Sequence, residues 1–293
     1  MSEVLFVLFL IVLIYPLSFI PFSVLYLLSD FFYLLLFKIF KYRVGVTKSN
    51  LRNSFPEKED KEITQITRAY YHFLCDVFLE TFKLLSISKN KLSQRVQFSE
   101  RFISLFDDYR KLNTPVIAVM GHLGNWEWAG ASFSLQISNK LYALYHPLSN
   151  KIFDRLMLKI RTRFGGKMIP MNQLPRFLSQ IKNTPSVLCF IADQTPPPEH
   201  AHWIQFLNQD TPFFKGPASV AKKMNWPIIF VSVKTTRKGN YYIDAELISD
   251  SNSDSAETIT QMWAAKLESK ILEQPSNWLW SHKRWKHKRE KWG

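Results

Sequence analysis

The fold of this chain is decided by the stretch Val116-Ile-Ala-Val-Met-Gly-His-Leu-Gly-Asn-Trp-Glu-Trp128. Its first five residues are apolar and mostly β-branched, which predicts a buried strand. Gly121 and Gly124 predict a turn after this strand, and Asn125 is a good N-cap for a helix that begins at Trp126. A strand that leads through a turn into a helix is typical of α/β proteins.

The same stretch carries a histidine and an acid, His122 and Glu127. On a regular helix, five residues turn the chain by about 140° beyond one revolution, which would point the two side chains apart. With His122 in the turn and Glu127 in the first helical turn, the side chains converge instead. A histidine oriented by a carboxylate can act as a general base, so the pair predicts acid–base chemistry. The alternative is a strand-end histidine that only precedes a helix cap.

Predicted strands and helices alternate after this stretch. Strands are predicted at Leu141–Tyr145, Met168–Pro170, Ser186–Ala192, Pro227–Val233 and Tyr241–Leu247, and helices at Asn150–Phe164, Leu174–Lys182, from Phe213–Ala218 onward and at Ala256–Glu273. The alternation indicates an α/β fold with a mixed, largely parallel sheet flanked by helices. An earlier helix is predicted over Glu62–Ser86, on which His72 and Glu80 are interpreted as structural polar residues.

The N-terminus is almost wholly apolar from Val4 to Phe37, and basic residues follow at once. This order is the reverse of a signal peptide and places the rest of the chain in the cytoplasm by the positive-inside rule. Pro16 and Pro21 argue against one straight span, so we expect a helix kinked there and a second apolar helix in or against the membrane. We therefore predict an anchor over residues 1–40 and one domain over 41–293. The alternative is a buried hydrophobic hairpin.

The composition suits an enzyme that works at a membrane surface. The chain has 24 Phe, 11 Tyr and 9 Trp, and a formal net charge of +14. This surplus of cations favours anionic partners such as phospholipid headgroups, phosphorylated glycolipids, an acidic carrier protein or nucleic acid. Cys75 and Cys189 lie in no metal-binding spacing, so we expect free thiols in a reducing compartment.

Gly121-His-Leu-Gly-Asn-Trp-Glu127 resembles the H-x-x-x-x-(D/E) motif of glycerolipid acyltransferases, in the glutamate form of the lipid A biosynthesis (lauroyl/myristoyl) acyltransferase family. Further segments resemble that family in the same order: Tyr42-Arg43, Asn50-Leu51, Phe55-Pro-Glu57, Tyr145-His-Pro-Leu148, Asn150–Arg163, Asp193-Gln194, Phe214-Lys-Gly-Pro-Ala218 and Trp278-Leu-Trp-Ser-His-Lys-Arg-Trp-Lys286. The resemblance covers nearly the whole chain, and it departs from the family pattern at His146, where arginine is usual.

The resemblance implies a glycerolipid-acyltransferase-like fold and transfer of an acyl chain from acyl carrier protein to a hydroxyl of a lipid A precursor, as a late, secondary acylation. His122 would take the proton from the hydroxyl as it attacks the thioester, and Glu127 would fix the tautomer of the ring. Backbone N–H groups around Gly124 and Asn125, or else Arg161 or Arg163, are candidate donors to the oxyanion. No metal and no redox cofactor is required.

Other candidate binding residues lie at predicted strand ends and helix starts. Tyr145 and Asp193 each end a strand, where an open α/β sheet places its ligands, although Asp193 in a structural turn is the alternative. The basic helix adds Arg155, together with Arg161 and Arg163, for phosphates or an acidic carrier; the alternative is a solvated basic face. Lys215 and Gly216 precede a helix, and either an anion site or a plain helix start fits them.

The basic tail from His282 to Gly293 interleaves tryptophans with cations, a pattern that also suits single-stranded nucleic acid. On a chain with an apolar anchor, it fits the anionic inner leaflet better. The expected partners are therefore acyl carrier protein, an anionic glycolipid acceptor and inner-membrane phospholipids, with no nucleic acid. Rival hypotheses are acylation of another membrane lipid, acyl-CoA as the donor, and a membrane-tethered binding protein without chemistry.

Overall fold

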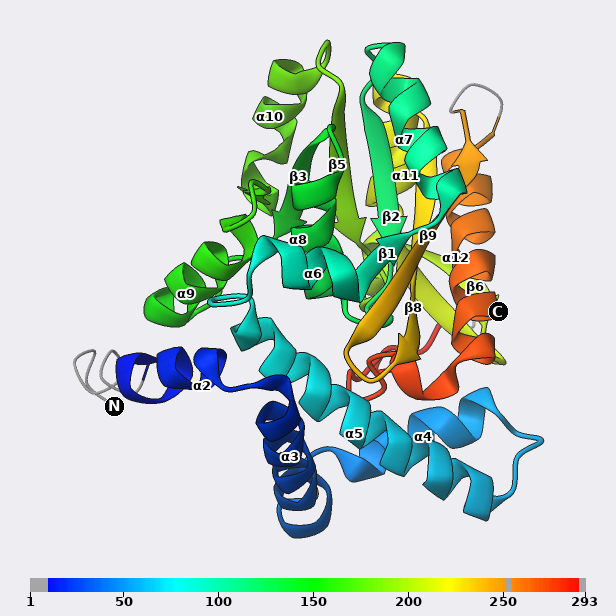
Figure 1. Cartoon of the computed structure of the whole chain (residues 1–293). Helices are drawn as coiled ribbons and strands as arrows, with labels where there is room; N and C mark the ends of the chain where they lie inside the picture. Colours follow the sequence, from blue (N-terminus) through cyan, green and yellow to red (C-terminus); the bar gives the residue numbers. More distant parts are fainter. Residues whose placement is uncertain (1–9, 251–253, 290–293) are drawn as a thin grey trace.

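A seven-stranded sheet with helices on both faces forms the centre of the computed structural model, which describes residues 10–250 and 254–289 (Figure 1). The strands of this sheet are β1 (Val96–Phe98), β2 (Val116–Met120), β3 (Lys140–Tyr145), β4 (Lys167–Pro170), β5 (Ser186–Ile191), β8 (Ile228–Arg237) and β9 (Asn240–Ser249). They lie in the order β1-β9-β8-β2-β5-β3-β4. Neighbouring strands are parallel apart from β8 and β9, which form an antiparallel hairpin. The predicted mixed, largely parallel α/β sheet is therefore confirmed.

The helices divide between the two faces of the sheet. The helices after the N-terminal segment are α4 (Val44–Ser54), α5 (Asp60–Lys83), α6 (Lys89–Arg95), α7 (Glu100–Lys111), α8 (Trp126–Gln136), α9 (Lys151–Thr162), α10 (Leu174–Ile181), α11 (Gly216–Met224) and α12 (Ala256–Glu273), with short 3-10 turns at Met171–Gln173, Pro198–His200 and Pro275–Asn277. Buried side chains of α6 to α9 join one core cluster, and those of α10 to α12 join the other. Helix α5 contributes to both and crosses the end of the sheet (Figure 1).

Strand β2 shows why its sequence is a continuous apolar run. Val116, Ala118 and Met120 belong to the core on one face, whereas Ile117 and Val119 belong to the core on the other face. All five are buried, because helices cover both faces of the central strands. The side chain of Asn125 accepts a hydrogen bond from the Trp128 N–H at 2.9 Å, so α8 begins at Trp126 as predicted.

The N-terminal segment is broken where its prolines predict a break. Helix α2 (Tyr15–Phe19) ends before Pro21, which caps α3 (Phe22–Tyr33), and π-helical turns precede α2 at Leu10–Ile14 and follow α3 at Leu34–Ile39. The segment Phe22–Ile39 is long and apolar enough to cross a membrane, and only 17% of it is buried within the protein. The predicted anchor also includes residues 1–9, which lie outside the described residues.

Some elements differ from the prediction. β1, α4, α6 and α7 were not predicted, nor was the antiparallel hairpin of β6 (Ala201–Phe206) and β7 (Gln209–Phe214). Phe213 and Phe214, expected to open a helix, end β7 instead, and α11 begins at Gly216 with Pro217 in its first turn. Phe213 is fully buried under α12, and this tertiary contact fixes its extended conformation. The predicted loop at Ser249–Ser255 includes residues 251–253, which are not described.

Candidate active site

His122 lies in the turn after β2, and the carboxylate next to it comes from the turn after β5. These strands are parallel neighbours, so their carboxyl ends meet at one edge of the sheet. The Nδ1 atom of His122 lies 2.6 Å from Oδ1 of Asp193, and the backbone N–H of His122 donates to Oδ2 at 2.7 Å. Asp193 thus holds both the ring and the backbone of His122.

Glu127 is not the partner of His122 in this structure. Its carboxylate accepts two hydrogen bonds from Arg161 of α9, from Nε at 2.9 Å and from Nη2 at 2.6 Å. The first turn of α8 directs Glu127 toward α9, while the neighbouring strand brings Asp193 to the histidine. His122 and Glu127 thus line one cavity, but the predicted contact between them is replaced by the pairs His122–Asp193 and Glu127–Arg161.

The surroundings of Asp193 keep it ionised. Burial would raise the pKa of Asp193, but the imidazole and backbone N–H of His122 and the indole of Trp278 outweigh burial and lower the pKa to about 2. The indole Nε1 of Trp278 donates to Oδ2 at 2.7 Å, and Asp193 is 2% exposed. The C-terminal block that contains Trp278 therefore supports the site, a role that the sequence analysis did not assign.

The contacts fix the tautomer of His122. An ionised carboxylate only accepts hydrogen bonds, so Nδ1 must carry the proton that Asp193 receives. The lone pair of neutral His122 is then on Nε2, which lies 3.4 Å from the side-chain nitrogen of Gln194. This is the arrangement that a general base requires.

The two glycines of the turn are needed for different reasons. Gly124 has a φ of +61°, and a Cβ there would lie 2.6 Å from the backbone oxygen of Val233. A Cβ on Gly121 would lie 2.7 Å from Leu267 and 3.0 Å from the Asp193 carboxylate. A side chain at Gly124 would displace the turn that carries His122, because the atom it meets is backbone, whereas a side chain at Gly121 would push against Leu267 and the Asp193 carboxylate.

A cavity of about 280 Å³ opens beside His122. Its polar wall consists of His122, Glu127, Tyr145, His146, Arg161, Lys167 and Gln194. Its apolar wall comes from β2, β3 and β5 and includes Met120, Leu141 and Ile191. Of the predicted site residues, the structure therefore brings His122, Glu127, Tyr145 and Arg161 together around one space, with Asp193 behind His122.

An apolar groove of about 630 Å³ lies on the other side of Gln194. It is lined by Phe32, Leu35, Leu36 and Phe40 of the N-terminal segment, by Leu74, Cys75 and Phe78 of α5, and by Leu279 and His282 near the C-terminus. Gln194 lines both the groove and the cavity, and its side-chain nitrogen lies 3.4 Å from Nε2 of His122.

The remaining predicted residues lie away from this cavity. Arg155 is exposed on α9, and Lys215 forms an ion pair with Glu257 at 3.7 Å next to Gly216. Arg163 donates from Nη1 to the backbone oxygens of Leu84 and Ile87, the latter at 2.8 Å. Arg163 therefore holds the chain after α5.

Asn125 and Cys75 are buried within the fold, whereas Cys189 is partly buried and lines the cavity beside His122. The side chain of Asn125 caps α8 and also donates to Glu80 at 2.7 Å. Both cysteines are free, as expected, and burial raises the pKa of each thiol to about 12. A raised pKa disfavours the thiolate, which is the nucleophilic form of a cysteine.

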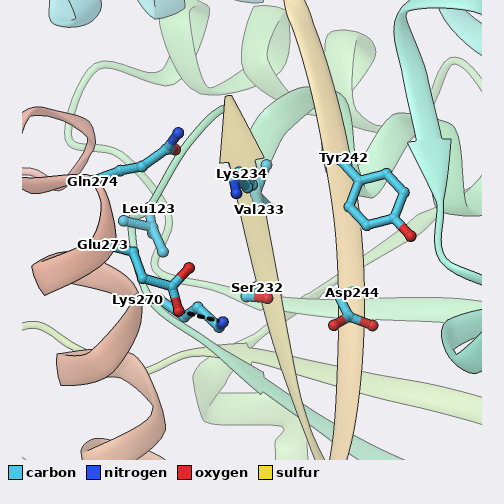
Figure 2. A pocket seen from close by; sticks show the side chains of 9 residues that line it. All are labelled: Leu123, Ser232, Val233, Lys234, Tyr242, Asp244, Lys270, Glu273 and Gln274. Atoms are coloured by element: carbon cyan, nitrogen blue, oxygen red, sulfur yellow. Dashed lines mark hydrogen bonds and ion pairs between the residues drawn. The ribbon is translucent and has the colours of Figure 1, made fainter. Parts of the chain in front are cut away.

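A smaller cavity of about 210 Å³ lies outside this site (Figure 2). Leu123 of the turn points into it, with Lys234 of β8, Asp244 of β9 and the ion pair of Lys270 with Glu273 on α12. Leu123 therefore lines this cavity, whereas His122 lines the larger one.

We expect Trp278→Phe to lower the free energy of unfolding by about 1–3 kcal/mol at pH 7, because a buried carboxylate loses a donor. The folded-state pKa of Asp193 lies below the usual value, so its contacts stabilise the fold above about pH 4 and stop doing so as the pH falls toward 2. The difference in the free energy of unfolding between parent and variant, measured by urea titration, should therefore shrink as the pH falls from about 4 toward 2.

Trp285→Phe is the matched control, since the indole of Trp285 donates to the neutral hydroxyl of Thr211 at 2.7 Å. Its effect should not change between about pH 4 and pH 2, because a hydroxyl does not titrate there. A Trp278→Phe penalty that is equally independent of pH would contradict the assignment of Trp278 to the Asp193 carboxylate.

A largely parallel sheet with a histidine–carboxylate pair at its carboxyl edge defines an α/β protein equipped for acid–base chemistry. A sequence model of the bacterial lipid A biosynthesis acyltransferases matches residues 1–287, and the chain belongs to this family, as its motifs predict. It is 24% identical over 161 residues to a lipid A biosynthesis myristoyltransferase of Escherichia coli (strain K12), a match that covers 54% of this chain and 48% of that protein. Lipid A biosynthesis acyltransferase 1 of Shigella flexneri is similar to the same extent. The match thus spans about half the length of these relatives.

Proposed function

We propose that this protein transfers a fatty acyl chain from acyl carrier protein to a hydroxyl of a lipid A precursor, as a late acylation. The observation that supports the reaction most strongly is the position of His122. Its Nδ1 is held by the ionised Asp193, and its Nε2 lies beside Gln194, which lines both a polar cavity and an apolar groove. Membership of the lipid A biosynthesis acyltransferase family supports the substrate class.

In the proposed reaction, Nε2 of His122 takes the proton from the acceptor hydroxyl. The oxygen of that hydroxyl attacks the thioester carbonyl, and a tetrahedral intermediate forms. When the intermediate collapses, the carbon–sulfur bond breaks, the ester forms, and the imidazolium returns its proton to the leaving thiolate. Asp193 stabilises the imidazolium between these two steps.

Arg161 is the proposed donor to the oxyanion. It lines the cavity, and the carboxylate of Glu127 holds it through two hydrogen bonds. Arg163 is less suited, because its guanidinium binds backbone oxygens after α5. The N–H of Gly124 already donates to the backbone oxygen of Asn277 at 2.9 Å, so it is not a candidate. Glu127 then contributes by orienting Arg161.

The apolar groove is the proposed site for the acyl chain. Its lining is mostly aliphatic and aromatic, and one end reaches Gln194 beside His122. Its walls include the N-terminal segment, so an acyl chain could enter it from the bilayer. We propose residues 1–40 as the membrane anchor and residues 41–293 as the catalytic domain, on the cytoplasmic face of the inner membrane, as the basic flank after the apolar segment suggests.

The exposed side of α9 is the proposed docking surface for the anionic substrates. Lys151, Arg155 and Lys159 are spaced four residues apart, so they form one stripe along the helix. Arg161 on the same helix lines the cavity. An acidic carrier bound at this stripe would thus have its thioester close to the site.

Mass spectrometry of lipid extracts tests the reaction and the acceptor together. We expect cells without the gene to accumulate a lipid A species lighter by one acyl chain, and the parent gene but not His122→Ala to restore the heavier species. Loss of an acyl chain from a different lipid would replace the proposed acceptor but keep the chemistry. Unchanged lipids throughout would overturn the proposed function.

A further inference from the structure

Polar side chains are concentrated on one side of the otherwise apolar helix α3, and that side faces α5. The pairs run antiparallel: Tyr26 with Glu80 at 2.7 Å, Ser29 with Asp76 at 2.5 Å, and Asp30 with His72 at 3.1 Å. The opposite side of α3 exposes Val24, Leu27 and Phe31. The proposed anchor is thus docked on the catalytic domain by a row of polar contacts, and Glu80 is at one end of it.

Glu80 is fully buried, and three side chains from different elements donate to its carboxylate. Oε1 accepts from the hydroxyl of Tyr26 on α3, and Oε2 accepts from the hydroxyl of Tyr241 on β9 at 2.5 Å. Oε2 also accepts from Nδ2 of Asn125 at 2.7 Å. Glu80 therefore joins the N-terminal segment, the sheet and the turn that carries His122.

The contact with Asn125 fixes both ends of one amide group. Nδ2 of Asn125 donates to Glu80, while Oδ1 accepts from the Trp128 N–H and caps α8. The indole of Trp128 donates in addition to the backbone oxygen of Glu80 at 2.7 Å. The backbone that follows His122 is thus attached to α5 at two points.

We propose that Glu80 is a positioning residue, which sets the turn carrying His122 through Asn125 and connects that turn to the membrane-facing helix α3. The inference rests on the proposed function, in which His122 is the base. Glu80 is not among the residues that line the cavity, so it acts through Asn125. Docking of α3 against α5 and the geometry of the site then depend on each other.

The burial of Glu80 also affects how the stability of the fold depends on pH. Burial raises the pKa of Glu80 to about 7, even though its three donors act in the opposite direction. Since this pKa lies above the usual value for a glutamate, the acid makes the fold less stable as the pH rises through the interval from about 4 to 7.

Glu80→Gln tests the inference, and Asp76→Asn is its matched control. The glutamine amide would place its N–H2 group either toward Tyr26 or toward Tyr241 and Asn125, so at least one of the three donors loses its acceptor. Asp76 lies on the same helix and also binds α3, but its described contacts do not include Asn125. We expect Glu80→Gln to lower kcat by about 10- to 100-fold with KM for the acyl donor changed by less than about threefold, because a misplaced base affects the chemical step. Asp76→Asn should leave kcat within about threefold of the parent.

Hydrogen exchange provides a readout that does not depend on activity. We expect residues 121–128 to exchange faster in Glu80→Gln than in the parent, and at the parent's rate in Asp76→Asn. Equal effects of the two variants on kcat and on exchange would overturn the inference, since Glu80 would then act only as a contact with α3. An inactive parent would overturn the proposed function instead, and the exchange result would still decide the role of Glu80.

Tyr241→Phe covers the case in which Glu80→Gln does not fold. It removes one hydroxyl and leaves Glu80 and Asn125 in place. We expect Tyr241→Phe to lower kcat by less than Glu80→Gln does, with KM changed by less than about threefold. Residues 121–128 should again exchange faster than in the parent. If both kcat and the exchange rate of residues 121–128 stayed at their parent values, the inference would be overturned.

Discussion

Replacing His122 by alanine is expected to lower kcat for acyl transfer by about 10²–10⁴-fold, the usual contribution of a positioned general base. The effect should be on kcat rather than on KM, because the ring takes the hydroxyl proton only as the bond to the acyl carbon forms. Steady-state kinetics with a purified acyl carrier thioester and a lipid A precursor measure both constants.

His202→Ala is the matched control for this substitution. His202 lies on β6 and is not among the residues that line the cavity beside His122. The kcat of His202→Ala should stay within about threefold of the parent value. If His122→Ala behaved like His202→Ala, the assignment of His122 as the base would be wrong.

Asp193→Asn is expected to lower kcat by about 10³–10⁴-fold, in line with the loss seen when the orienting carboxylate of a histidine base becomes an amide. An asparagine keeps the shape of the side chain, but its N–H2 group would have to face a donor of His122 or Trp278. His122 would then no longer be held with its proton on Nδ1 and its lone pair on Nε2. Because Asp193 acts on the reaction only through His122, Asp193→Asn should lower kcat only when the imidazole of His122 is present.

A double-mutant cycle decides between the two carboxylates of the site. Asp193→Asn should lower kcat hardly further in a His122→Ala background, since both changes disable the same group. Glu127→Gln should instead be coupled to Arg161→Gln, because those two side chains bind each other. Strong coupling of His122 to Glu127 and weak coupling to Asp193 would contradict the pairing in this structure.

Several elements could be predicted because their signals are local. The start of α8 at Trp126 follows from one capping side chain, Asn125, and α12 spans Ala256–Glu273 as its pattern predicts. The hairpin of β8 and β9 follows from the turn at Lys238-Gly-Asn240 between two apolar runs. The missed hairpin of β6 and β7 has no such signal, since its extended conformation is set by packing against α12.

Local patterns in the sequence are enough to predict that β2 is a buried strand, that His122 follows it at the sheet edge, and that a carboxylate accompanies it. Which carboxylate binds His122, Asp193 rather than Glu127, depends on the pairing of distant strands. Asp193 is 71 residues from His122 along the chain and becomes its neighbour because β2 and β5 pair in parallel. Likewise, Glu80 reaches Asn125 only because α5 crosses the end of the sheet. Capping and turn preferences are properties of a few consecutive residues, whereas strand order and helix docking arise from burial of apolar surface by the whole chain, and they place the distant groups.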